Sequence, residues 1–169
     1  KEKLLKVLFI SEQLADPKEV MPYLLTLLEI KEFDFYLKFR PYRDNFEIWL
    51  KKYHPDILNR VKIVRGTMQE AVARADVVVG SNSTAVLEAL LQLKPFVFYK
   101  TKKWGDFFEI KSLHSQDCFF AENPEELVSS IKKSVNVSQE ELKRLQERFF
   151  GDPYQNGSKW VVDQAEKFL

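Results

Sequence analysis

The sequence has few residues of the kinds that build disulfide-stabilised or metal-binding proteins. Cys118 is the only cysteine among 169 residues, which excludes an internal disulfide and any site with several thiolates. A single thiol agrees with a reducing compartment, so we expect a cytoplasmic location. The two histidines, His54 and His114, have no cysteine or paired carboxylates at metal-ligand spacing, so we expect no metal site.

Charge of one sign and long apolar runs are also lacking. The 26 Lys and Arg residues balance 25 Asp and Glu residues, so no bulk positive field is present to hold nucleic acid or an anionic membrane. No apolar run approaches the roughly 18 residues that a membrane-spanning helix needs. We therefore expect no nucleic-acid partner and no transmembrane segment, and any anion site must be local.

Three common functional motifs are missing from the sequence. It contains neither the GxxxxGK[ST] motif of P-loops nor the GxGxxG motif of dinucleotide-binding folds. The GxSxG motif of serine hydrolases is absent as well. The sequence therefore leaves the catalytic residues unknown.

What the sequence does contain is a regular alternation of strand and helix patterns. Short apolar runs predict strands over 7–10, 33–39, 61–64, 76–81, 96–99 and 118–121. Capped or amphipathic segments predict helices over 17–30, 46–53, 68–75, 85–93, 124–135, 139–150 and 157–169. This order predicts a single α/β domain over residues 1–169, a doubly wound, Rossmann-like parallel sheet of about six strands with helices on both faces.

Ligands of such sheets bind beyond the carboxyl ends of the strands, and the turn after the strand at 76–81 is the best candidate. Gly80 lets a ligand approach the backbone. Ser81, Asn82, Ser83 and Thr84 lead into a helix whose first amides are unpaired and carry positive dipole charge. The hydroxyl groups can donate to phosphate oxygens, so the turn predicts an anion site. The simpler alternative is that Ser81 or Asn82 only caps the helix.

Four charged residues add to this candidate site. Glu88 lies four residues after Thr84 in an otherwise apolar helix, where it can accept hydrogen bonds from ribose hydroxyls or form a structural ion pair. Arg40 and Arg43 follow the second strand, where a guanidinium can bind a diphosphate with two parallel hydrogen bonds; a solvated loop is the alternative. Arg65 ends the third strand, beside backbone groups that can face a nucleobase edge.

Residues 75–99, ADVVVGSNSTAVLEALLQLKPFVFY, resemble the donor-binding half of GT-B glycosyltransferases. The segment LKFRPYRD resembles the basic segment after a strand in capsule and teichoic-acid polymer transferases, and VKIVRGTMQEAVARADVVVG is similar to their base-facing strand and helix. The resemblance covers residues 33–169, including a return helix at the end. The Gly-Gly pair of epimerase-like members is absent.

The resemblance implies a function and a set of roles. Donor phosphates would lie at Ser81, Ser83 and Thr84, ribose hydroxyls at Glu88, and Arg40 or Arg43 would neutralise the diphosphate. The nucleotide sugar would be a substrate, with no cofactor. An N-terminal domain with the acceptor site would be a partner absent from this chain, and the full-length protein, acting in bacterial surface polysaccharide synthesis, would be cytoplasmic or peripheral to the membrane.

Several alternatives remain open on the sequence. A hydrolysing epimerase or a glycerophosphate transferase uses the same half-site, and a flavodoxin-like or receiver-like regulatory domain has a similar strand order. A receiver needs an acidic pair after its first strand and an Asp after its third, where this chain has Ser11-Glu12 and Arg65-Gly66. A structural module with a degenerate site is a further alternative. The nucleobase, sugar, acceptor, stereochemistry and oligomeric state stay open.

Overall fold

The computed structural model describes residues 3–112, 118–152 and 157–167. Its six strands form one sheet in the order β3-β2-β1-β4-β5-β6, and every neighbouring pair is parallel. The strands are β1 (Leu5–Ile10), β2 (Phe33–Lys38), β3 (Lys62–Ile63), β4 (Val77–Gly80), β5 (Phe96–Tyr99) and β6 (Phe120–Ala121). The predicted doubly wound α/β fold is confirmed. The strand order reverses between β1 and β4, which is where such sheets bind ligands.

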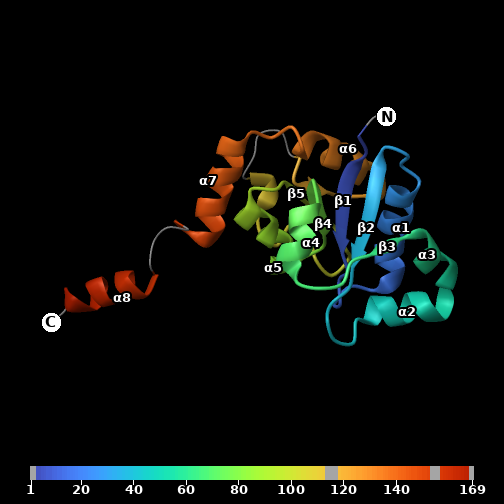
Figure 1. Ribbon diagram of the computed structural model, residues 1–169, viewed down its shortest axis with the longest axis horizontal. Helices are drawn as coiled ribbons and strands as arrows, with labels where there is room; N and C mark the ends of the chain where they lie inside the picture. Colours follow the sequence, from blue (N-terminus) through green and yellow to red (C-terminus); the bar gives the residue numbers. More distant parts are fainter. Residues whose placement is uncertain (1–2, 113–117, 153–156, 168–169) are drawn as a thin grey trace.

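Helices cover both faces of the sheet (Figure 1). On one face, α1 (Pro17–Leu28), α2 (Asn45–Tyr53), α3 (Pro55–Arg60) and α6 (Pro124–Ser134) share a core with alternate strand residues such as Phe9 and Val79. On the other, α4 (Met68–Arg74), α5 (Thr84–Leu87), the 3-10 helix η1 (Glu88–Gln92) and α7 (Gln139–Phe150) pack on Leu8 and Val78. Because successive side chains of a strand point to opposite faces of the sheet, each face has a hydrophobic core of its own.

Two further helical segments complete the described part of the chain. The 3-10 helix η2 (Ile110–Ser112) follows the loop after β5, and α8 (Gly157–Glu166) projects away from the sheet in Figure 1. Val161 and Val162 of α8 are exposed. The predicted final helix extended to residue 169, but residues 168–169 lie outside the described part.

Several predicted boundaries are wrong. The strand predicted over 61–64 pairs only at Lys62–Ile63, and the one predicted over 118–121 only at Phe120–Ala121. The sequence pattern also missed α3, which begins at Pro55, a residue expected to end the preceding helix. Proline is tolerated at the first position of a helix because its missing N–H would have no partner there.

The prediction of one continuous α-helix over 85–93 is wrong, and this difference bears most on the predicted anion site. The segment is α-helical only over Thr84–Leu87 and continues as the 3-10 helix η1. Leu93 then adopts φ of 50°, and the amide of Lys94 donates to the Ala89 carbonyl at 3.0 Å, a helix end that stops the chain before Pro95. The macrodipole of so short an α-helix is small, since it sums over only a few peptide units.

Candidate functional site

A groove of about 490 Å³ lies at the carboxyl edge of the sheet, beside the ends of β1, β2, β3 and β4. Three chain segments, 38–41, 66–70 and 83–88, supply most of its walls. The lining residues are Ile10, Lys38, Phe39, Arg40, Pro41, Gly66, Thr67, Met68, Glu70, Ser83, Ala85 and Glu88. Apolar walls with a few polar groups are typical of small-molecule sites, and the volume is in their usual range.

Three of the predicted site residues come together in this groove. Arg40 follows β2, Ser83 precedes α5, and Glu88 begins η1. Glu88 is half-buried, and no hydrogen bond or ion pair joins its carboxylate to the described residues. A carboxylate in that position can accept hydrogen bonds from a ligand.

Ser83 also caps α5. Its Oγ accepts a hydrogen bond from the Ala85 amide at 3.3 Å, so neither Ser81 nor Asn82 is the cap. Thr84 is exposed and does not line the groove. Ser81 is buried, and neither its Oγ nor the buried Oδ1 of Asn82 has a hydrogen-bond partner among the described residues. The turn therefore presents only Ser83 to the groove.

Gly80 does not line the groove either. It ends β4, with Val86 and Ile10 close to where a side chain would begin. Its lack of a side chain allows α5 to pack on the sheet, which is a role other than the ligand approach expected from the sequence.

The groove has two cationic side chains, and both bind neutral acceptors. The guanidinium of Arg40 donates to Oε1 of Gln13. The ammonium of Lys38 donates to the Gly66 carbonyl at 2.6 Å. Burial, with Arg65 nearby, lowers the pKa of Lys38 below its ordinary value. Neither cation is neutralised by its partner, so each can bind an anionic ligand without first breaking an ion pair.

Arg65 is placed differently. Its Nη2 lies 2.7 Å from Oε1 of Glu47 in α2, and its guanidinium stacks on the Phe39 ring at 5.6 Å. The hydrogen bond from Arg65 lowers the pKa of Glu47. Arg43 is exposed outside the groove and has φ of 44°. Of the three predicted arginines, only Arg40 faces the groove.

The backbone groups expected to face a nucleobase are partly engaged. The Gly66 carbonyl accepts from Lys38, and the Thr67 amide donates to Oε2 of Glu70 at 3.0 Å. Thr67 Oγ1 in turn accepts from the Glu70 amide at 3.2 Å, which completes a capping box at the start of α4. The backbone hydrogen bond from Thr67 lowers the pKa of Glu70.

Sequence reasoning missed several residues of this region. Lys38 is the last residue of β2, and its place on the wetter face of an alternating strand was a usable signal. Asp44 caps α2 by accepting from the Glu47 amide at 2.9 Å, and an Asp three residues before a Glu is a recognisable helix start. Nothing in the sequence indicated that Gln13 meets Arg40.

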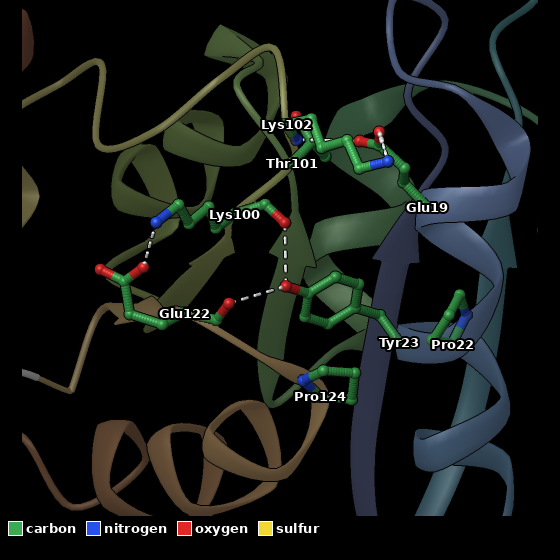
Figure 2. Close-up of a pocket in the computed structure, with 8 residues that line it drawn as sticks. All are labelled: Glu19, Pro22, Tyr23, Lys100, Thr101, Lys102, Glu122 and Pro124. Carbon is green, nitrogen blue, oxygen red and sulfur yellow. Dashed lines mark hydrogen bonds and ion pairs between the residues drawn. The ribbon is translucent and has the colours of Figure 1, made fainter.

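A second hollow of about 300 Å³ lies between α1, the end of β5 and the start of α6 (Figure 2). Its charged side chains pair with one another: Lys100 Nζ lies 2.7 Å from Glu122 Oε2, and Lys102 Nζ lies 4.0 Å from Glu19 Oε1. The Lys102 amide also donates to Glu19 Oε2 at 2.9 Å. Tyr23 Oη donates to the Lys100 carbonyl at 2.8 Å, and burial, then the charge of Glu122, raises the pKa of Tyr23 to about 12. None of the predicted site residues lines it.

The described residues offer neither a metal-binding cluster nor a membrane-spanning helix. No group of three His, Cys, Asp or Glu residues in 3–112, 118–152 and 157–167 is arranged to hold a metal ion. His54 packs against Trp49 at 4.7 Å, and His114 lies outside the described residues. In the same part of the chain, no helix combines the length and apolar composition needed to cross a bilayer.

Comparison with known proteins gives a fold relationship. No protein-family model and no curated protein matches the sequence. Among solved structures, the chain is similar to Acinetobacter baumannii MurG, with a TM-score of 0.55 and 14% identity over 98% of this chain and 53% of that one. Yeast NADH kinase complexed with NADH gives a TM-score of 0.48 and 14% identity, covering 80% of this chain and 39% of the kinase chain.

The chain thus spans about half the length of the MurG chain that it matches. At this level of identity the likeness shows the fold, a Rossmann-like α/β sheet. The likeness is one of fold alone, and the GT-B role that the sequence resemblance implied stays a prediction.

Proposed function

We propose that this chain is the donor-binding half of a GT-B glycosyltransferase, and that the groove binds a nucleoside diphosphate sugar. The observation that carries the proposal is the meeting of Arg40, Ser83 and Glu88 in one groove at the carboxyl edge of the sheet. The MurG likeness supports the architecture, and the resemblance of residues 75–99 supports the donor-binding role.

Each part of the groove suits one part of such a ligand. Pro41 and Met68 offer apolar surface to a nucleobase. Glu88 is the acceptor for ribose hydroxyls. Arg40 and Lys38 are the cations for the diphosphate, and the guanidinium of Arg40 can donate two parallel hydrogen bonds to it. The anion site proposed here depends on these side chains rather than on the short α5 helix.

The cations of the groove suit the chemistry of sugar transfer. When the bond between the sugar and the diphosphate breaks, negative charge develops on the departing nucleoside diphosphate, and fixed cations stabilise it. The attacking hydroxyl belongs to an acceptor, and we assign the acceptor site and the general base to an N-terminal partner domain. The nucleotide sugar is a substrate, and we propose no additional cofactor.

A bacterial surface polysaccharide is the product class that we propose, on the resemblance of LKFRPYRD to capsule and teichoic-acid polymer transferases. A cytoplasmic, membrane-peripheral location of the full-length protein is also part of the proposal.

Calorimetric titration of the chain with uridine, cytidine, guanosine and adenosine diphosphates tests donor binding. We expect one of these four diphosphates to bind with a dissociation constant below about 1 mM, the weak end of the usual affinity scale. Arg40→Ala should weaken that binding. Arg60→Ala is the matched control, because Arg60 does not line the groove. Its Nη2 lies 2.6 Å from Oε1 of Glu29, in an ion pair elsewhere on the molecule. Absence of binding by all four nucleotides, or equal effects of the two variants, contradicts the proposal.

A further inference from the structure

One buried carboxylate joins the end of β1 to the loop that carries Arg40. Asp44 is 2% exposed and accepts hydrogen bonds from three separate places. The Ser11 hydroxyl donates to its Oδ2. The Arg40 amide donates to the same oxygen at 2.8 Å, and the Glu47 amide donates to Oδ1 at 2.9 Å.

Capping of α2 accounts for only one of these bonds. An N-cap side chain needs to accept from one amide in the first helical turn, and Glu47 supplies it. The bonds from Ser11 and Arg40 come from the ends of two neighbouring strands. A carboxylate used only as a cap would usually face solvent, since burying a charge is costly without hydrogen bonds to it.

The carboxylate also closes a tight loop. Residues 40–43 leave β2 and return to α2, and the loop is pinned at its first residue by the bond from the Arg40 amide to Asp44. Arg43, at the other end, has φ of 44°, a conformation that non-glycine residues adopt only when their surroundings hold it. The side chain of Arg40 is held in addition by Gln13, from the loop after β1.

We propose that Ser11 and Asp44 are positioning residues for Arg40, so that the end of β1 sets the anion affinity of the groove. This inference rests on the proposed function. Ser11 fixes the carboxylate, the carboxylate fixes the Arg40 amide, and the guanidinium is thereby kept at the groove wall. Neither Ser11 nor Asp44 lines the groove, so each acts through Arg40.

A double-mutant cycle tests the proposal with the nucleoside diphosphate that binds best in the four-base titration. Ser11→Ala should weaken binding about 3- to 10-fold, less than the full value of a charge-assisted hydrogen bond because Ser11 acts on the ligand only through Arg40. It should also reduce the salt dependence of binding, as Arg40→Ala does. In the Arg40→Ala background, Ser11→Ala should have no further effect, because residues in one network are not additive. In the Glu88→Ala background the effect should persist.

The matched control for Ser11→Ala is Ser134→Ala. Ser134 is also buried, and its Oγ donates one hydrogen bond, to the Ile131 carbonyl at 2.9 Å, on a helix that does not line the groove. Both variants should lose thermal stability, Ser11→Ala the more because it takes a hydrogen bond from a buried carboxylate, and only Ser11→Ala should lose affinity. Asp44→Asn, which keeps the shape of the side chain, should weaken binding as Ser11→Ala does.

The outcomes separate the two proposals. If the unmodified chain binds no nucleoside diphosphate, the proposed function fails and this inference fails with it. If it binds, but Ser11→Ala has no effect or is fully additive with Arg40→Ala, only the positioning role is overturned. Faster hydrogen exchange of the Arg40 amide in Ser11→Ala, measured without ligand, is the further expected result, and unchanged exchange counts against the role.

Discussion

A Cβ atom on Gly80 would lie 2.5 Å from Cγ2 of Val86, a separation that real Cβ atoms essentially never show. Val86 is fully buried in α5, and the Cβ and carbonyl oxygen of Ile10, in the neighbouring strand, would each lie 3.6 Å away. The end of β4 and the start of α5 therefore lie in direct contact at Gly80 and Val86. The turn between them, which carries Ser83 to the groove, can keep this conformation only while that contact is kept.

Gly80→Ala should accordingly destabilise the protein by about 1–3 kcal/mol, the usual cost of an added group in a packed core. Because the chain has 169 residues, each kcal/mol should lower the melting temperature by about 2–4 °C. Gly105→Ala is the control, since nothing lies within 4 Å of a Cβ there, and it should change little. Val86→Ala should cost less stability in the Gly80→Ala background than in the unmodified chain, and equal costs in the two backgrounds would argue against this contact.

Glu88→Ala should weaken nucleotide binding by about 1–3 kcal/mol, the range for losing hydrogen bonds to a charged group. Its melting temperature should stay close to that of the unmodified chain, because the Glu88 carboxylate bonds to none of the described residues. Calorimetry and a thermal melt on the same samples separate the two effects. A lower melting temperature with unchanged affinity would assign Glu88 a structural role instead of the ribose role.

The ion pair of Glu47 with Arg65 should make stability depend on pH in the acid range. Hydrogen bonding from Arg65, and then from Lys51, lowers the pKa of Glu47 below its ordinary value of 4.5. A carboxyl with a lowered pKa in the folded state adds stability above its unfolded pKa, and that stability is lost as pH falls through the folded pKa.

Glu47→Gln should therefore cost about 0.5–1 kcal/mol near neutral pH, because the Arg65 side chain is largely exposed and solvent screens the pair. The difference from the unmodified chain should shrink as pH falls below about 4.5, the ordinary glutamate value. Urea unfolding at pH 7, 5 and 3.5 measures it. A difference that stays constant over this range would mean that the Glu47 charge contributes no stability.

The chain alone should have no glycosyltransferase activity, if the acceptor site and general base belong to a partner domain. A base must lie within hydrogen-bond reach of the acceptor hydroxyl, and a one-sided groove does not exclude water from the sugar. Incubation with radiolabelled nucleotide sugars and candidate acceptors should give slow donor hydrolysis at most. Efficient glycoside formation would overturn the assignment of catalysis to a partner domain.

The fold was predictable because its signals are local. Apolar runs such as Val77–Val79 gave the central strands, and caps such as Thr67 gave the helix starts. The 3-10 helix η1 was not predictable, because its apolar spacing also fits an α-helix. Its last turn is shaped by Leu93 and by Gln146 of α7, which donates to the Leu90 carbonyl at 2.7 Å.

The site was predictable only in part. Parallel strands end at one edge, so the residues after β2 and β4 had to approach each other, and Arg40, Ser83 and Glu88 do so. The pairing of Arg65 with Glu47 depends on how α2 packs, which the sequence pattern does not give. The burial of Asp44 likewise arises from contacts between segments far apart in the chain, as its bond to Ser11 illustrates.

The three segments of the groove come from both sides of the strand-order reversal. Segments 38–41 and 66–70 follow β2 and β3, and segment 83–88 follows β4. A bound ligand would bridge the two halves of the sheet, so its binding energy would add to the stability of the whole domain rather than of one loop. At a ligand concentration of 100 times the dissociation constant, that gain is about 2.7 kcal/mol, so a thermal-shift screen of unlabelled compounds is a practical way to search for the natural ligand.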